Sequence, residues 1–259
     1  MINKIAIVGT GNVTHHLSDV FVNNNIGITC FASRNHDRAI TLAAIRNSVA
    51  SEISSISKDV DLIIIAVSDD AISDVVQKIP FGNYIVVHTS GSISIDVFKN
   101  RFEKYGVFYP LQSFSKSREV DFSEIPLLVE GNTEATTDSL YTLAKRISGR
   151  VEKMGSEKRG MLHLSAVIAN NFVNFLAAKS YGFLEHNNID GTLLQPLIKE
   201  TIARLQTHHP NEMQTGPAKR NDKKTIEKHL KQLESNPKLQ SLYRLISQQI
   251  IEQYHGGEL

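Results

Sequence analysis

The chain has 259 residues, of which 41% are hydrophobic and 21% are charged, and its formal net charge is +1. This length supports a sizeable core and suggests about two domains. A near-neutral charge balance provides no general field that attracts nucleic acid or an anionic membrane, so we expect neither as a partner.

The single cysteine, Cys30, excludes an internal disulfide and a cysteine-based metal cluster, although ten histidines leave sites of histidine and aspartate open. Cys30 falls in a predicted strand, and we interpret it as a buried, inert thiol. The first residues lack the basic, apolar and small-residue succession of a signal peptide. No run approaches the ~18 consecutive apolar residues that span a bilayer, so we expect a cytoplasmic protein. We assign no residue to a metal site.

The beginning of the chain carries the strongest functional signal. Residues 5–8 are an apolar run, residues 9–14 form a Gly-rich turn, and apolar residues then recur at helical spacing. This order of strand, turn and helix is the context that the dinucleotide fingerprint requires. Gly9 permits a tight turn, and Gly11 lets a pyrophosphate approach the backbone at the helix N-terminus. The predicted cofactor contacts in this turn are Gly9, Thr10, Gly11, Asn12 and Val13.

The third position of the fingerprint holds Thr14 where Gly or Ala is usual. The match is therefore imperfect, and a tight turn without a ligand stays an alternative.

The end of a second predicted strand, residues 26–32, bears on the choice of cofactor. An acidic residue about 20 positions after the glycines would bind the ribose of NAD, whereas this chain has Ser33, Arg34 and Asn35. Arg34 could pair with a 2′-phosphate, and Ser33 and Asn35 could donate hydrogen bonds to it. We therefore predict NADP as the cofactor, the alternative being that Arg34 is a solvated turn residue.

Strands and helices alternate as far as about residue 154. We predict strands at residues 61–67, 84–87, 107–110, 126–130 and 150–154, helices at residues 36–46, 72–79 and 134–147, and a polar loop at residues 115–124. The alternation predicts an α/β domain with a mostly parallel sheet and helices on both of its faces.

Ligands in such sheets bind beyond the carboxyl ends of the strands. Val67 and Ser68 end one predicted strand, and we predict that both contact the cofactor. His88 and Ser90 end the next, which makes both candidates for chemistry. For His88, a hydrogen-bonded structural histidine is an equal alternative.

The pattern changes after Gly155. Residues 157–185 predict one helix that is apolar on nearly every side, so we expect it to be buried. At about 100° per residue, His163, Asn170 and Asn174 share one stripe and Asn171 lies about 80° away. The stripe is either a polar seam against another helix or a substrate-binding face at the mouth of the cofactor domain.

Further helices are predicted at residues 192–205, from residue 223 and at residues 239–254. The loop before the second of these contains Arg220, which either contacts an anionic ligand or lies on the surface, and Asp222, which we predict to be a helix N-cap. We expect the glycine-containing tail to fray. The predicted domains are residues 1–154, which bind the dinucleotide, and residues 155–259, which are all-α and serve substrate binding and dimerisation.

Several motifs together resemble one known family. They are GTGNV at residues 9–13, AVSDD at 66–70, HTSG at 88–91, PLQSF at 110–114, His163 with Asn171, and TGP at 215–217 with Arg220 and Asp222. Over essentially its full length the chain is similar to the Rossmann-like oxidoreductases that carry a helical C-terminal domain of unknown function. These are related to 6-phosphogluconate dehydrogenase, ketopantoate reductase and pyrroline-5-carboxylate reductase.

The resemblance implies a Rossmann-like, doubly wound, mostly parallel sheet followed by an all-α domain. It also implies NADP as the cofactor, reduction of a small carbonyl or imine compound, and a homodimer formed through the C-terminal helices. Ser68 stands where the family usually has proline, and Tyr109 where it usually has histidine. No lysine occupies the helix position that the hydroxyacid dehydrogenases use.

We predict that the cofactor supplies the hydride and that the protein orients the substrate with Ser90, Asn171 and Arg220. His163 is the first candidate for the proton donor and His88 the second. Because the lysine is missing, a non-catalytic NADP-binding sensor or scaffold is an alternative. A deazaflavin cofactor is a third possibility.

Overall fold

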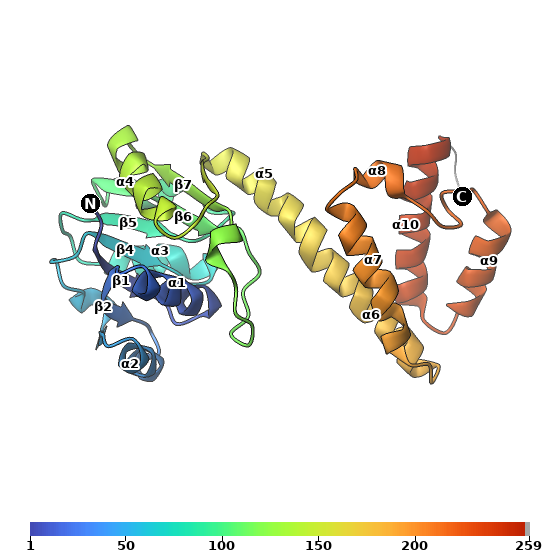
Figure 1. The fold of residues 1–259 in the computed structure, drawn as a ribbon, viewed down its shortest axis with the longest axis horizontal. Coiled ribbons are helices and arrows are strands. Elements are labelled where there is room, and N and C mark those ends of the chain that lie inside the picture. Colours follow the sequence, from blue (N-terminus) through green and yellow to red (C-terminus); the bar gives the residue numbers. More distant parts are fainter. Residues whose placement is uncertain (257–259) are drawn as a thin grey trace. The chain divides into compact units, whose positions relative to one another are not determined.

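The computed structural model describes residues 1–256, which form two compact units, Met1–Ala169 and the residues from Asn170 onward (Figure 1). The boundary between the units lies inside a long helix. The tail that we expected to fray includes residues 257–259, which lie outside the described residues.

The first unit is built on an eight-stranded sheet with the order β3-β2-β1-β4-β5-β6-β7-β8. Its strands are β1 Lys4–Val8, β2 Gly27–Ala32, β3 Val49–Ser51, β4 Leu62–Ile65, β5 Ile85–His88, β6 Lys104–Pro110, β7 Leu127–Gly131 and β8 Val151–Lys153. Its helices are α1 Asn12–Asn23, α2 His36–Ile45, α3 Asp69–Lys78 and α4 Glu134–Lys145. All neighbouring strands are parallel except β6 and β7. The predicted fold class is confirmed.

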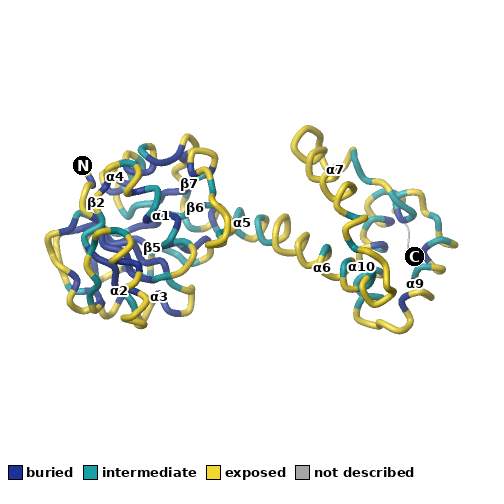
Figure 2. The backbone as a smooth tube through the Cα atoms, turned by 60° about the horizontal axis from the view of Figure 1, so that its bottom comes forward, coloured by how far each residue is buried: buried dark blue, intermediate teal, exposed yellow. Residues whose placement is uncertain are grey.

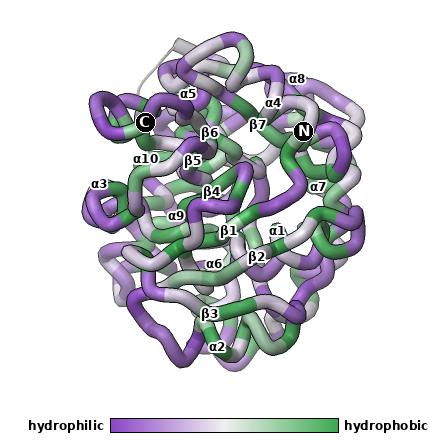
Figure 3. Tube along the Cα trace, turned by 90° about the vertical axis from the view of Figure 1, so that its left-hand side faces the viewer, coloured by the Kyte–Doolittle hydropathy of each residue, from purple (hydrophilic) through white to green (hydrophobic). Residues whose placement is uncertain are grey.

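The central strands are apolar on both faces because helices cover both. In β1, Ile5 and Ile7 pack into a core shared with α1, α2 and α4, whereas Ala6 and Val8 pack into a second core shared with α3. All four residues of β4 are fully buried. In Figure 3, segments of these central strands are coloured green, which marks hydrophobic residues.

Two features of the sheet were missed in the sequence. β3 has only three residues, lies at the sheet edge and exposes Val49, so it carries no run of buried residues to predict it. β6 begins at Lys104, three residues earlier than predicted, because it also pairs with β5. The predicted polar loop at residues 115–124 contains a short 3-10 helix, Phe122–Glu124, whose Phe122 is buried.

The long helix is α-helical over α5, Ser156–Ala166, π-helical over Val167–Phe172, and α-helical again over α6, Val173–His186. The prediction that it is buried is wrong for the single chain (Figure 2). The exposed apolar residues of this helix are Met161, Leu164, Ile168, Phe172, Val173, Phe175 and Leu176. By length and composition alone, residues 156–186 could cross a membrane, although polar residues interrupt them.

The π-helical segment also bears on the predicted polar stripe. Hydrogen bonds from i to i+5 widen the turn, so each residue advances by only about 80° instead of about 100°. Asn170 and Asn171 lie in this segment. Their spacing is therefore not that of the regular α-helix from which the stripe was derived, and the stripe stays a prediction.

The second unit also contains α7 Gln195–Leu205, α8 Pro210–Met213, α9 Lys223–Gln232 and α10 Pro237–His255. Its buried core is small and consists of Ala218, Ile226, Leu230 and Ile251. Leu245 and Ile246 of α10 are exposed. Asp222 caps α9, because its carboxylate accepts a hydrogen bond from the Thr225 backbone N–H at 3.1 Å, as predicted.

Candidate functional site

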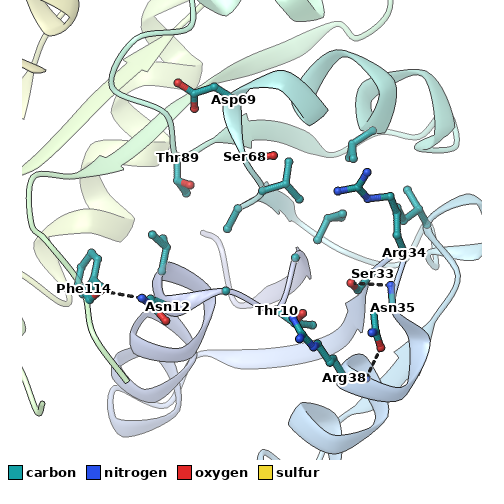
Figure 4. Close-up of a pocket in the computed structure, with 18 of the residues that line it drawn as sticks. Thr10, Asn12, Ser33, Arg34, Asn35, Arg38, Ser68, Asp69, Thr89 and Phe114 are labelled. Carbon is teal, nitrogen blue, oxygen red and sulfur yellow. Dashed lines mark hydrogen bonds between the residues drawn. The ribbon is translucent and has the colours of Figure 1, made fainter. Parts of the chain in front are cut away.

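A cavity of about 660 Å³ lies at the carboxyl ends of β1, β2, β4 and β5 in the first unit (Figure 4). All ten predicted cofactor contacts line it, namely Gly9, Thr10, Gly11, Asn12, Val13, Ser33, Arg34, Asn35, Val67 and Ser68. Its other lining residues include Arg38, Asp69, Thr89, Gln112 and Phe114, which were not predicted as contacts. The sheet topology explains this gathering, because parallel strands end at the same edge.

The glycine corner fits a phosphate group. Gly9 has φ +120°, and a Cβ there would lie 2.1 Å from the carbonyl oxygen of Ala66, so only glycine fits. A Cβ on Gly11 would meet nothing within 4 Å, which leaves open space in front of the backbone. Gly11 is also the N-cap of α1 and offers no side-chain cap to the first N–H groups of that helix. Those N–H groups and the helix dipole are suited to an anion.

Asn12 fixes the neighbouring wall of the cavity. Its side-chain amide donates a hydrogen bond to the carbonyl oxygen of Phe114 at 2.8 Å (Figure 4). The ring of Phe114 stacks on His16, whose Nε2 lies 2.9 Å from the carbonyl oxygen of Ser115. The segment after β6 is thereby fastened to α1.

Two arginines from the segment after β2 also line the cavity. Arg34 and Arg38 are exposed, and neither guanidinium forms an ion pair within the described part of the chain. Asn35 caps α2, since its Oδ1 accepts a hydrogen bond from the Arg38 backbone N–H at 3.0 Å, and Ser33 Oγ accepts from the Asn35 N–H at 3.2 Å (Figure 4). Capping orients the two arginines, and Asn35 keeps its amide N–H groups for a ligand.

His88 is fully buried and stacks on Phe98 with a ring distance of 5.6 Å. Its Nδ1 accepts a hydrogen bond from the Ser90 backbone N–H at 3.1 Å. Burial, and to a lesser extent the charge of Arg159, together lower the pKa of His88 to about 4. His88 therefore holds the loop after β5 as a neutral ring, and it does not line the cavity. Its catalytic role stays a prediction.

Ser90 shapes the same loop. Its hydroxyl oxygen accepts hydrogen bonds from the backbone N–H groups of Ser92 and Ile93, both at 3.1 Å. The Ser92 hydroxyl donates to Asp69, a cavity residue at the start of α3, at 2.5 Å. Ser90 is buried, so the structure shows a loop-forming serine whose predicted contact with substrate remains untested.

His163 lies against this loop. An ideal Cβ on Gly91 would come within 2.6 Å of the His163 ring, so the Gly91 backbone packs directly on the imidazole. Nδ1 of His163 lies 3.0 Å from the hydroxyl oxygen of Tyr109 at the end of β6. The structure thus brings together the HTSG loop, His163 and Tyr109. Tyr109 was noted in the sequence only as a departure from the family.

A buried ion pair supports the arrangement and was not predicted. Arg159 is fully buried and pairs with Glu130 at the end of β7. The same guanidinium donates to the carbonyl oxygen of Ile93, while Glu130 accepts from the backbone N–H of Ser156 at 3.0 Å. Arg159 directly follows a glutamate and a lysine in the first turn of α5, so no local pattern in the sequence distinguishes it from solvated charges.

Two predicted site residues belong to the second unit. Asn171 lies in the π-helical segment and is exposed, and its Oδ1 is 3.4 Å from the Asn170 amide nitrogen. Arg220 is exposed in the loop before α9. Their roles stay predictions. Within residues 1–256, no group of three or more His, Cys, Asp or Glu side chains is arranged to hold a metal ion.

Comparison with known proteins identifies the family. A family model described as NADP oxidoreductase, coenzyme F420-dependent, matches residues 4–96, and a domain of unknown function (DUF2520) matches residues 125–250. A crystallised protein from Bacteroides fragilis, assigned as an NADP oxidoreductase, is 34% identical over 97% of this chain and 98% of that one, with a TM-score of 0.91. The chain belongs to this family of NADP oxidoreductases. The predicted resemblance and the predicted cofactor, NADP, are confirmed for the family.

Other solved structures share the fold of this NADP oxidoreductase. A Thermotoga maritima protein is 27% identical over 96% of this chain and 98% of that one, with a TM-score of 0.73. An imine reductase from Myxococcus stipitatus, crystallised with NADP⁺, is 13% identical over 98% of this chain and 95% of that one, with a TM-score of 0.69. No curated protein matches the chain.

The neutral state of His88 predicts a pH-dependent stability. Between pH 6.5 and about 4 the unfolded chain binds a proton at this ring and the folded chain does not, so the free energy of unfolding falls as the pH falls through this window. At about pH 5 the loss from this group is about 2 kcal/mol relative to about pH 7.5. Urea unfolding of wild type and His88→Asn at both pH values measures it, because the asparagine amide does not titrate.

Exposed His36 provides the control, and His36→Asn is expected to keep the wild-type pH dependence. Equal pH dependence in wild type and His88→Asn would show that the buried ring does not titrate as described.

Proposed function

We propose that this oxidoreductase is an NADP-dependent reductase that transfers a hydride between NADP(H) and a small carbonyl or imine compound. The observation that supports it best is the cavity at the strand ends, which is lined by an uncapped glycine corner after β1 and by two unpaired arginines after β2. The glycine corner suits the pyrophosphate of the cofactor, and the two arginines match the charge of the 2′-phosphate.

The residues present fit this cofactor. The N-terminus of α1 with Gly11 would hold the pyrophosphate, Arg34 and Arg38 would hold the 2′-phosphate, and Val67, Ser68 and the loop after β5 would line the rest of the site. When bound, the reduced nicotinamide supplies the hydride.

The protein's own residues orient the hydride acceptor and stabilise the charge that develops on its oxygen or nitrogen. We assign to His163 the donation of the hydrogen bond or proton that a developing alkoxide or amide requires. Ser90 and His88 shape the loop on which His163 packs, and Asn171 and Arg220 are proposed to orient the substrate.

A screen of substrates should include more than carbonyl compounds and imines. The family model that matches the first domain is described as coenzyme F420-dependent, so a deazaflavin belongs among the compounds tested. Binding of NADPH without turnover of any compound would favour the sensor or scaffold instead.

We also propose that the protein acts in the cytoplasm as a homodimer formed through its helical half. Leu164, Ile168, Phe172 and Leu176 follow one another at intervals of four along the long helix, and all are exposed in the chain. Monomers rarely expose contiguous apolar patches of more than a few hundred Å², and a second copy of the chain supplies the same apolar surface in return.

Arg34→Ala is expected to weaken NADPH binding by roughly 10- to 100-fold and NADH binding by less than about threefold, because only NADPH carries the phosphate that the guanidinium binds. Isothermal titration calorimetry with each nucleotide measures the two changes. Arg118→Ala removes an exposed arginine outside the cavity and should leave both affinities unchanged. Equal weakening of NADPH and NADH would argue against a phosphate contact at Arg34.

His163→Ala is expected to lower kcat by roughly 100-fold or more, which is the usual contribution of a positioned acid or hydrogen-bond donor. The measurement is NADPH oxidation with whichever imine or 2-keto acid proves active on the wild-type enzyme. His229→Ala is the matched control, since His229 also pairs with a tyrosine hydroxyl, that of Tyr243 at 2.8 Å. Unchanged activity in His163→Ala would remove the proposed role.

Phe172→Glu is expected to convert the dimer into a monomer, because a carboxylate would be buried without a partner at the centre of the apolar stripe. Sedimentation analysis gives the mass in solution. Ser139→Glu adds the same charge to an exposed site on α4 and should leave the dimer intact. A monomeric wild-type protein would contradict the proposed assembly.

A further inference from the structure

The contact between Tyr109 and His163 is not explained by the proposed function alone. It joins the end of β6 to α5 across 54 residues of sequence, with 3.0 Å between Oη and Nδ1. The two rings meet edge to face, with centroids 6.0 Å apart. Both residues lie in the first unit and both are half-buried.

The direction of this hydrogen bond follows from the state of the tyrosine. Burial raises the pKa of Tyr109, so the phenol keeps its proton at neutral pH. A hydroxyl proton that leaves water needs an acceptor. Among the described residues, His163 Nδ1 is the one hydrogen-bond partner of the Tyr109 hydroxyl. Tyr109 therefore donates and Nδ1 accepts.

The position of the ring follows from Gly91. The backbone of that residue packs against Cβ, Cγ and Nδ1 of His163, so this edge of the imidazole is covered. Nε2 lies on the opposite edge and makes no hydrogen bond with any residue that the structure describes. When Nδ1 accepts, a neutral imidazole carries its proton on Nε2.

We propose that Tyr109 is a positioning residue that makes neutral His163 present its Nε2–H to the substrate. The inference rests on the proposed function and adds the tautomer and the group that sets it. The oxygen of a carbonyl or the nitrogen of an imine would accept this hydrogen bond. The bond draws electron density from the carbon that receives the hydride. The imidazole keeps its own proton, and the proton that the resulting alkoxide or amide anion requires comes from water.

A spectroscopic test does not depend on knowing the substrate. Two-bond ¹H–¹⁵N correlation spectra of the protein labelled with ¹⁵N-histidine report the tautomer of each ring above the ordinary imidazole pKa of about 6.5. His163→Asn identifies the His163 signals by their disappearance. We expect Nδ1 without a proton in the wild type, and a shifted Nδ1 resonance in Tyr109→Phe, which lacks only the hydroxyl.

Tyr243→Phe is the matched control, because it removes the hydroxyl from the other tyrosine–histidine pair. It should move the signals of His229 and leave those of His163 unchanged. A proton on Nδ1 of wild-type His163, or an Nδ1 resonance that is the same in Tyr109→Phe as in the wild type, would overturn the proposal.

Kinetics supply the second readout. Tyr109→Phe is expected to lower kcat by roughly 10- to 100-fold, the usual effect of losing a group that orients an active histidine, with the KM for NADPH unchanged. An unchanged kcat on an active substrate would overturn the role in catalysis. If no compound is reduced by the wild type, the proposed reductase fails, while the spectra still decide the tautomer.

Discussion

The close approach of Gly9 to Ala66 is the constraint on which the site depends. β1 and β4 are adjacent parallel strands, and the chain leaving β1 must turn at once without touching the end of β4. Only a residue without Cβ can do so, since any other would collide with a carbonyl oxygen. The turn directs the N-terminus of α1 into the cavity. If the turn were wider, the helix would still pack on the sheet, but its free N–H groups would not face the cavity.

The second half of the site is held by buried polar groups. His88 and Ser90 shape the loop after β5 from within, and Arg159 ties that loop to β7 and α5 from outside. Burying a charged pair carries a desolvation cost. Hydrogen bonds from Arg159 to Glu130, Ile93 and Ser156 offset part of this cost, although Nε of Arg159 has no hydrogen-bond partner among the described residues. The loop that these contacts hold places the Gly91 backbone against His163. The same loop thus serves as a wall for the cofactor cavity, through Thr89, and as a platform for the histidine.

The helical half buries less of its apolar surface than the sheet does. Helices of the same chain cover the apolar strands of the sheet, whereas the long helix leaves apolar residues exposed over much of its length. Among its described residues the second unit has five buried hydrophobic side chains, those of Ala218, Ile226, Leu230, Leu233 and Ile251, which is little for a domain that stands alone. Association of two chains would complete such a unit, and this gives one physical reason for the sequence to place apolar residues on every side of that helix.

Local patterns in the sequence determined the α/β fold class and ten of the residues that line the cavity, because apolar runs followed by turns locate strand ends, and parallel strands bring those ends to one edge. They also predicted the Asp222 cap, which depends on neighbours three residues away. Only the tertiary structure placed Tyr109 beside His163, buried Arg159 against Glu130 and paired β3 with β2. Those contacts join residues far apart in the chain, so the periodicity of residues within one segment cannot predict them. The exposure of the long helix and its π-helical segment were also found only there, since hydropathy does not state which surface covers a helix and a regular 3.6-residue period does not predict a π turn.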